Sequence, residues 1–287
     1  MSVGLAIREA AEALEGKSDT PRLDAELLMA HLLGVSRSDM LLRHMRDEVQ
    51  SGYARLVVRR MQGEPVAYII GNEEFHGLTL SVTPAVLIPR ADSEVLVDAA
   101  LAARPDARRV LDCGTGSGAL LLAVLNGLPE AKGIGIDKSS AALEIARANA
   151  ESLGLFSRAH MTEADWHLPG WADGLGQFDL ILANPPYVED DAELDPQVRD
   201  HEPASALFSG PDGLHDYRVL VPQLAALLAP QGLAFVEIGW QQAEAVSAIA
   251  ASAGLSTQLH HDLADRPRVL EMAVQANISL GKPAAGT

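Results

Sequence analysis

The sequence has little of three things: cysteine, basic residues and long apolar runs. Its one cysteine, Cys113, excludes an internal disulfide and is typical of a reducing compartment, so we expect a cytoplasmic protein. No apolar run approaches the roughly 20 residues that span a bilayer, so we expect no membrane helix. Lysine and arginine number 22 against 39 acidic residues, a formal net charge of −17. This balance offers no general attraction to phosphate backbones and counts against a nucleic-acid substrate.

Apolar residues make up 48% of the chain, enough to bury a core. Residues 1–72 are predicted to form an N-terminal helical domain. Within it, Pro21 follows Thr20, a predicted N-cap, and leucines recur at helical spacing until Gly34. A further helix is predicted from about residue 48 to residue 62. Its basic residues are expected on a solvated face, and they are Arg55, Arg59 and Arg60.

The pattern changes over residues 73–91, which we interpret as a β-hairpin linker. Short β-like runs at residues 68–70 and 78–82 surround Gly71 and Gly77, as in a hairpin. The sequence therefore predicts two domains joined by this linker.

Strands and helices alternate over residues 92–279. This alternation predicts an α/β fold with a parallel sheet and right-handed crossovers. Two runs near residues 256–263 and 269–275 are too close together for a crossover helix, so they predict an antiparallel hairpin at the sheet edge. Residues 280–287 are expected to form a disordered tail.

A glycine-rich loop follows the first strand predicted in this domain. The strand ends near Asp112, and five residues then lead into an apolar helix: Gly114, Thr115, Gly116, Ser117 and Gly118. Glycines permit a tight turn and let the backbone approach a ligand at a helix N-terminus. The run also satisfies the dinucleotide pattern G-x-G-x-x-G/A, so an NAD-binding fold competes at this point.

Two more residues are predicted around the same pocket. Asp137 ends the second strand, where a carboxylate can accept hydrogen bonds from both hydroxyls of a ribose. Trp166 follows a weaker strand and would stack on or wall an adenine, although the pattern favours a core position nearly as strongly. These residues predict a nucleoside cofactor and serve NAD and S-adenosylmethionine equally.

The tetrapeptide Asn184-Pro185-Pro186-Tyr187 decides the chemistry. Its two prolines fix the backbone and remove two N–H donors, which leaves carbonyl acceptors, an amide side chain and an aromatic ring. Such a set suits a planar NH₂ group. The Asn184 side-chain oxygen and the Pro185 carbonyl each accept one N–H, and Tyr187 lies against the plane. Hydride transfer has no evident use for this set, so methyl transfer from S-adenosylmethionine is favoured over an NAD enzyme.

These motifs resemble a known family. A Asp-x-Gly-x-Gly-x-Gly loop followed by Asn-Pro-Pro-Tyr is shared by methyltransferases that act on adenine, cytosine or glutamine amide nitrogens. Further segments resemble the HemK/PrmC family, the release factor glutamine methyltransferases: residues 63–69, 74–77, 86–90, 202–207, 210–214 and 237–239. The resemblance spans residues 21–274. The chain departs from the family at residues 91–94 (Ala-Asp-Ser-Glu, where Pro-Glu-Thr-Glu is usual), at Cys113 (usually Leu) and at Ser209 (usually Gly).

The resemblance implies a helical domain followed along the chain by a Rossmann-like methyltransferase domain. We predict that the helical domain recognises the substrate, because the site alone cannot select one glutamine. The resemblance also implies methylation of the side-chain amide N5 of the glutamine in the Gly-Gly-Gln motif of peptide chain release factors, with S-adenosylmethionine as cofactor. Asn184, Pro185 and Tyr187 would be catalytic, and Pro186 would help to bind the substrate. Asp112, the glycine loop, Asp137, Trp166 and Asn184 would hold the cofactor.

No metal is needed for this chemistry, and the nine histidines show no metal-ligand spacing beyond the adjacent His260 and His261. Besides the weaker interpretation as an NAD enzyme, two alternatives stay open. A DNA adenine-N6 methyltransferase would use the same Asn-Pro-Pro-Tyr, but the acidic charge counts against it. The second alternative is a module that binds release factors without catalysis. The intact glycine loop, Asp137 and Asn184 count against this alternative.

Overall fold

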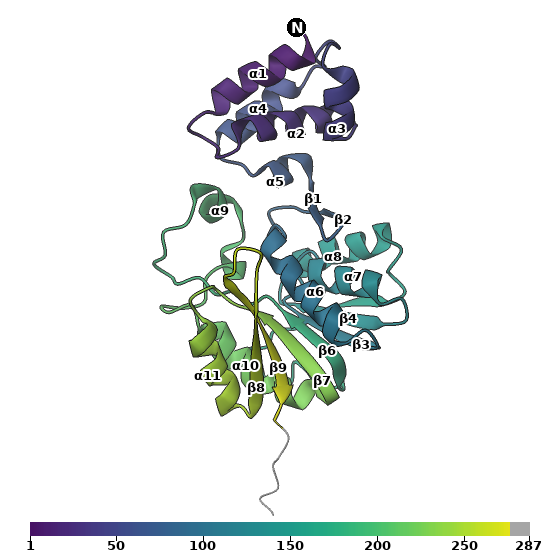
Figure 1. Ribbon diagram of the computed structural model, residues 1–287, viewed down its shortest axis with the longest axis vertical. Helices are drawn as coiled ribbons and strands as arrows, with labels where there is room; N and C mark the ends of the chain where they lie inside the picture. The colour runs from purple at the N-terminus through teal and green to yellow at the C-terminus, as the bar shows by residue number, and fades with distance from the viewer. Residues whose placement is uncertain (276–287) are drawn as a thin grey trace, which may run out of the picture. The chain divides into compact units, whose positions relative to one another are not determined.

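The computed structural model describes residues 1–275 and divides into two compact units. The first, called here the helical unit, comprises Met1–Pro89 and Asp191–Leu207. The second, called the sheet unit, comprises Arg90–Asp190 and the described residues from Phe208 onward. Figure 1 labels their helices and strands. Residues 280–287, where the sequence predicts a disordered tail, lie outside the described residues.

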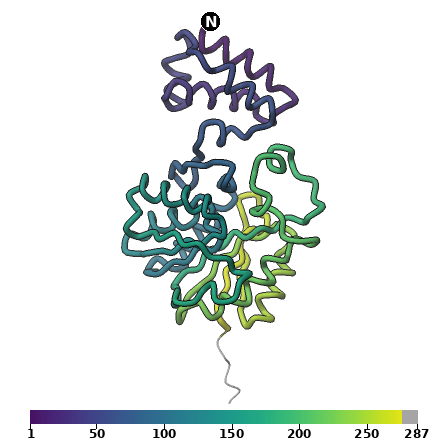
Figure 2. The backbone as a smooth tube through the Cα atoms, turned by 180° about the vertical axis from the view of Figure 1, so that it is seen from behind, coloured from purple at the N-terminus to yellow at the C-terminus, as the bar shows by residue number. Residues whose placement is uncertain are grey.

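The helical unit begins with a small bundle, drawn in purple and blue in Figures 1 and 2. Its core consists of fully buried side chains that include Ile7, Leu28 and Met40. As predicted, one helix begins at Pro21 and ends at Gly34, whose backbone is left-handed. The bundle elements are α1 (Val3–Leu14), α2 (Pro21–Leu33), α3 (Arg37–Asp39), the π-helical turn η1 (Met40–His44) and α4 (Tyr53–Met61).

Two boundaries in this unit differ from prediction. The fourth helix begins at Tyr53 and not near residue 48, because Gly52 has φ +111° and interrupts the helix there. Residues 68–70 belong to a short helix, α5 (Val66–Ile70), and not to a strand. A short apolar run does not distinguish a buried strand from a buried helix, and here Pro65 and the left-handed Gly71 bracket one helical turn.

A two-stranded hairpin follows α5, and it belongs to the helical unit. Its strands are β1 (Asn72–Phe75) and β2 (Leu78–Ser81), which pair antiparallel. His76 and Gly77 both have positive φ, as a two-residue hairpin turn requires. The short helices α9 (Pro196–His201) and η3 (Ala204–Ala206) lie in the later segment of the same unit.

The expectation that Arg60 lies on a solvated face is wrong. Its side chain is 4% exposed, and its Nε donates to Asp24 Oδ2 at 2.5 Å. The reason is helical periodicity, because Arg60 shares the buried face of α4 with Tyr53, Leu56 and Val57. Arg55 is exposed as expected, and Arg59 is half-buried and pairs with Glu64.

The sheet unit is built on a seven-stranded sheet in the order β5-β4-β3-β6-β7-β9-β8. The first five strands in this order are parallel, whereas β9 runs antiparallel to both neighbours. The predicted α/β fold with an antiparallel edge hairpin is thereby confirmed. The strands are β3 (Arg109–Cys113), β4 (Lys132–Asp137), β5 (Ala159–Glu163), β6 (Phe178–Ala183), β7 (Leu228–Glu237), β8 (Leu255–His261) and β9 (Pro267–Val274).

Helices cover both faces of this sheet (Figure 1). One face carries α6 (Glu94–Ala103), preceded by the 3-10 turn η2 (Ala91–Ser93), together with α7 (Ala119–Gly127) and α8 (Ser140–Ser152). The other carries α10 (His215–Leu227) and α11 (Ala243–Ser252). Ser139 caps α8, because its side-chain hydroxyl accepts a hydrogen bond from the Ala142 backbone N–H. Within residues 1–275, no helix is long and apolar enough to cross a membrane.

The strand order reverses between β3 and β6. The chain proceeds from β3 to β4 and β5 on one side, and then returns to β6 and β7 on the other. At such a switch point the loops after the two central strands diverge and leave a crevice at the carboxyl ends of the strands, where α/β proteins bind ligands. The loops that meet here are the glycine loop after β3 and Asn184–Tyr187 after β6.

Candidate active site

The glycine loop turns sharply between β3 and α7. Gly114, Gly116 and Gly118 all have left-handed backbones, with φ of +77°, +55° and +86°. At Gly116 a Cβ would meet no atom within 4 Å, so conformation and not crowding calls for glycine there. The loop therefore presents bare backbone to open space on that side, which allows a ligand to approach closely.

Asp112 lies directly behind this loop. Its side chain is fully buried, and its Oδ2 accepts a 2.6 Å hydrogen bond from the Thr115 hydroxyl. Its Oδ1 has no close hydrogen-bond partner among the described residues, although the Leu121 backbone N–H of α7 lowers the pKa of the carboxyl. Burial raises the pKa of this carboxyl to about 7, against the effect of the Thr115 hydrogen bond. Asp112 thus fixes the glycine loop through its hydrogen bond with Thr115, on the buried side of the loop.

The side chains of Thr115 and Ser117 face the protein and not open space. Thr115 is buried and its hydroxyl is used on Asp112, while Ser117 is buried and its carbonyl accepts from Asn149 Nδ2 at 2.8 Å. Any contact of these two predicted residues with a ligand would come from their backbone.

Asp137 holds the glycine loop in place at Gly116. Its Oδ2 accepts from the Gly116 backbone N–H at 3.0 Å, and its Oδ1 accepts from Ser139 N–H at 2.9 Å. A carboxylate oxygen can accept two hydrogen bonds, and each oxygen of Asp137 accepts one here. Both oxygens can therefore accept one more from a ligand hydroxyl. The half-buried carboxylate stands at the carboxyl end of β4, where the sequence predicts it.

Trp166 lies against the glycine loop at Gly114. Only 7% of it is exposed, and its Nε1 donates to Asp216 Oδ1 at 3.2 Å. A Cβ added at Gly114 would lie 3.1 Å from the indole ring, so the ring packs directly on this part of the loop. Trp166 is also part of the sheet unit's hydrophobic core, and stacking on an adenine stays a prediction.

The tetrapeptide Asn184–Tyr187 stands beside the glycine loop. Cys113 and Ala183 are register partners on adjacent parallel strands, so Gly114 and Asn184 leave the sheet side by side. Asn184 is half-buried, and its Nδ2 donates to Ser93 Oγ at 3.4 Å. Pro185 and Pro186 are buried. The fold therefore brings the glycine loop and Asn184–Tyr187 together at the carboxyl ends of β3 and β6.

Tyr187 reaches the neighbouring strand. Its hydroxyl donates to Glu237 Oε1 at 3.5 Å. Burial, and then the negative charge of Glu237, raise the pKa of Tyr187 to about 12, so its phenol stays protonated.

Glu237 and Ser93 are site residues that the sequence reasoning missed. Glu237 ends β7, is 1% exposed, and lies against both Tyr187 and Asn184. Burial raises its pKa to about 7. The signal that selected Asp112 and Asp137, an acid at the carboxyl end of a strand, applies equally to Glu237. Ser93 belongs to the segment that departs from the family, and it keeps the hydroxyl of the usual threonine.

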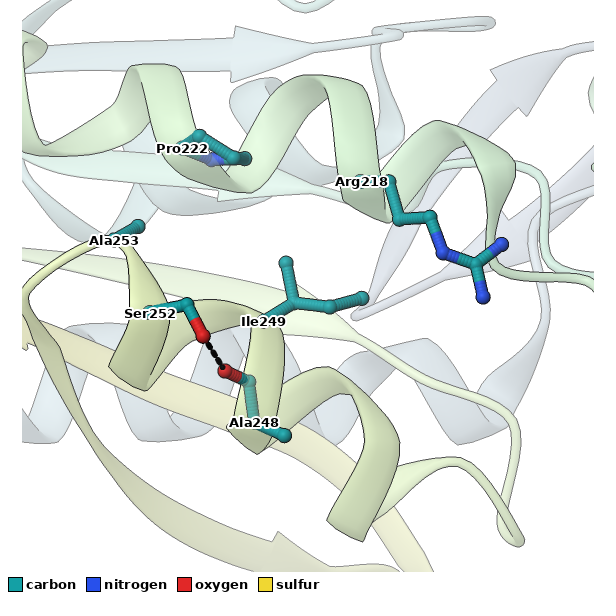
Figure 3. A pocket seen from close by; sticks show the side chains of 6 residues that line it. All are labelled: Arg218, Pro222, Ala248, Ile249, Ser252 and Ala253. Carbon is teal, nitrogen blue, oxygen red and sulfur yellow. Dashed lines mark hydrogen bonds between the residues drawn. The ribbon is translucent and has the colours of Figure 1, made fainter.

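A shallow groove elsewhere on the sheet unit is not part of this site. Figure 3 shows it between α10 and α11, with Arg218, Pro222 and Ile249 among its lining residues. None of the predicted site residues lines it. In the part of the chain that the structure describes, no group of three or more His, Cys, Asp or Glu could hold a metal ion.

Comparison with known proteins agrees with this geometry. A Methyltransferase domain model matches residues 105–265, and a PrmC N-terminal domain model matches residues 6–71. A solved methyltransferase from Pyrococcus furiosus has the same fold, with a TM-score of 0.50 and 17% identity, covering 70% of this chain and 90% of that one. The methyltransferase domain model covers more than half of the chain, so the chain is a methyltransferase.

Its relatives narrow the class further. The release factor glutamine methyltransferase of Caulobacter vibrioides is 43% identical, over 88% of this chain and 89% of its own. The enzyme of that name from Moorella thermoacetica is 40% identical, over 93% of this chain and 97% of its own. The chain belongs to the release factor glutamine methyltransferase family.

Proposed function

We propose that this protein transfers a methyl group from S-adenosylmethionine to the side-chain amide N5 of the glutamine in the Gly-Gly-Gln motif of peptide chain release factors. The observation that carries the proposal is the position of Asn184-Pro185 beside the glycine loop, in a chain of this family. Release factors work at the ribosome, so we place the protein in the cytoplasm.

The residues of the crevice fit the proposed cofactor. Gly116 leaves open space for close approach, Asp137 retains lone pairs for ribose hydroxyls, and Trp166 forms a wall beside Gly114. S-adenosylmethionine, when bound, supplies an electrophilic methyl group on a sulfonium centre.

The substrate nitrogen is held by acceptors. An amide nitrogen is a poor nucleophile because its lone pair is delocalised, so orientation must contribute most of the rate. Asn184 Oδ1 and the Pro185 carbonyl would each accept one N–H of the glutamine amide, and both would stabilise the positive charge that develops on nitrogen. Tyr187 would lie against the amide plane, and its protonated phenol excludes it as the base. The released proton passes to water or to a carbonyl oxygen.

The choice of one glutamine needs contacts beyond this crevice. Glutamine amides are common on protein surfaces. Asn184–Tyr187 can recognise an NH₂ group, but it offers few contacts that would select one glutamine over another. Selectivity then depends on binding remote from the reacting atom. We therefore assign residues 1–72 to recognition of the release factor outside its Gly-Gly-Gln loop.

Hydrogen–deuterium exchange on the full chain tests this assignment. Deleting residues 1–72 is a poor test, because residues 191–207 pack in the same compact unit and would lose their neighbours. Adding intact release factor should slow exchange in α1, α2 or α4. A short Gly-Gly-Gln peptide should leave those helices unchanged. Protection confined to the sheet unit with both ligands would contradict the recognition role.

The reaction itself is tested with methyl-labelled S-adenosylmethionine. The protein is incubated separately with intact release factor, free glutamine and DNA, and mass spectrometry locates the label. We expect one labelled glutamine in the release factor and none in the other two samples. Label on adenine would establish the DNA methyltransferase alternative instead. A cofactor that binds in calorimetry without any labelled product would indicate a binding module.

A further inference from the structure

The proposed reaction requires Asn184 to present its oxygen to the substrate. The two ends of a carboxamide have nearly the same shape, but one accepts hydrogen bonds and the other donates them. If the side chain turned over, its NH₂ would meet the substrate NH₂, donor against donor. The surroundings of Asn184 must therefore select one orientation.

Three elements meet at this side chain. Asn184 follows β6, Ser93 closes η2, and Glu237 ends β7. Asn184 Nδ2 donates to Ser93 Oγ at 3.4 Å, and hydrogen bonding from Ser93 and Asn184 favours the charged form of Glu237. Among residues 1–275, Asn184 Oδ1 accepts no hydrogen bond, so that oxygen is left for a ligand.

We infer that Glu237 is a positioning residue for methyl transfer: its carboxylate and the Ser93 hydroxyl hold the Asn184 NH₂ group and thereby turn Asn184 Oδ1 toward the substrate amide. The identity of that amide rests on the proposed function. The physical reason is that an ionised carboxylate only accepts hydrogen bonds, so only the NH₂ end of Asn184 can face it.

A purely structural role does not account for this acid. Glu237 is 1% exposed, its Oε2 has no hydrogen-bond partner among the described residues, and its neighbours along β7 are apolar. A buried carboxyl with an unsatisfied oxygen destabilises the fold relative to an apolar side chain of similar size. Arg268 offsets part of that cost by its positive charge, although its own partners are Asp92 at 2.9 Å and Asp262 at 3.2 Å.

Protonation of Glu237 would remove the preference for one orientation of the Asn184 side-chain amide. A neutral carboxyl can donate as well as accept, so it no longer distinguishes the two ends of Asn184. The pKa of Glu237 is raised to about 7, because burial outweighs the opposing effects of Ser93, Arg268 and Asn184, and the charge of Asp92 adds to the rise. Two tyrosines also face it, Tyr187 through its hydroxyl and Tyr217, which donates to the Glu237 backbone carbonyl at 2.9 Å. Turnover should therefore fall as pH drops through about 7.

The first test compares Glu237→Gln with Glu271→Gln, a matched control. Glu271 lies on the adjacent strand β9, pairs with His260 at 2.9 Å, and is not among the hydrogen-bond partners of Asn184. A glutamine at position 237 keeps the shape but can offer either end to Asn184. We expect kcat to fall about tenfold at pH 8, KM for S-adenosylmethionine to change less than about twofold, and the loss of kcat between pH 8 and pH 6 to flatten. Glu271→Gln should behave as wild type.

The second test is independent of activity. The side-chain amide resonance of Asn184, labelled with ¹⁵N and identified by its loss in Asn184→Ala, is followed from about pH 5.5 to 8.5. In the wild type it should shift with a midpoint near 7, and in Glu237→Gln it should not. Ser93→Ala removes the other acceptor and should lower kcat by a few-fold while the titration remains.

The outcomes separate the two proposals. An active wild type whose Glu237→Gln variant keeps both kcat and the pH profile would overturn the positioning role alone. So would a uniform loss of kcat, cofactor affinity and unfolding midpoint, which indicates a structural role. If the wild type leaves release factors unlabelled, the proposed function fails, and the Asn184 resonance still decides whether Glu237 holds that side chain.

Discussion

Replacing Asp112 with asparagine should change how the stability of the sheet unit depends on pH. The folded protein buries this carboxyl completely and raises its pKa from 3.8 to about 7. In the unfolded chain the same carboxyl is already charged at pH 5. Between pH 5 and pH 7 the folded state therefore holds a proton that the unfolded state has lost.

The sign and size of the effect follow from linkage. A group whose pKa is raised by folding contributes stability at low pH, and that contribution is lost as pH rises through the folded pKa. About two pH units separate pH 5 from the folded value, at about 1.4 kcal/mol each, so Asp112 alone should cost the wild type about 3 kcal/mol between pH 5 and pH 8.5. Asp112→Asn has no proton to lose and should not show this part of the decline.

The assay is urea unfolding at both pH values, followed by tryptophan fluorescence. All three tryptophans, Trp166, Trp171 and Trp240, lie in the sheet unit, so the signal reports that unit and not the helical one. The buried amide of asparagine also lowers the free energy of unfolding. Because an amide does not titrate, this effect is the same at both pH values and cancels in the comparison. Glu237 titrates in both proteins and cancels too. If variant and wild type lose equal stability between the two pH values, the burial of a titrating carboxyl behind the glycine loop is refuted.

Three further predictions concern single residues. Asn184→Ala should abolish most turnover while S-adenosylhomocysteine binds within roughly tenfold of wild type, since one hydrogen bond contributes about 1 kcal/mol; wild-type turnover would contradict the mechanism. Asp137→Ala should instead weaken that binding at least about tenfold in calorimetry, because charge-assisted hydrogen bonds contribute about 1.5–3 kcal/mol each, and an unchanged affinity would remove Asp137 from the cofactor site. Arg60→Met leaves Asp24 buried without its cation and should destabilise the helical unit by about 3 kcal/mol, seen as faster amide exchange in α2 and α4, whereas the exposed Arg55→Met should have no effect.

Short-range patterns determined the parts of this protein that depend on local geometry. Alternating strands and helices predicted the parallel sheet, and the two crowded runs near its end predicted the antiparallel edge hairpin; both are confirmed. The helix from Pro21 to Gly34 could be predicted because its first residue and its stop carry their own conformational preferences. Prediction was wrong where the local signal was ambiguous, as at residues 68–70, or where periodicity was not applied, as at Arg60.

The candidate site was predictable wherever one motif supplies the chemistry. The spacing of the glycines predicts the backbone geometry of the loop. Asp137 and Asn184–Tyr187 predict hydrogen-bonding groups, and each of these signals lies within a few residues of sequence. Strand order then places them together, because the loops after β3 and β6 leave a parallel sheet at the same edge.

Only the tertiary structure decided which side chains support that site. Ser93, Asn184 and Glu237 are far apart in sequence, and they meet because η2, β6 and β7 end at one point. Burial likewise decides the raised pKa values of Asp112 and Glu237, since it depends on every segment that packs around the carboxyl and not on its neighbours in the chain. Sequence determines which groups are present, and the packing of distant segments determines their charge state and the direction in which each one points.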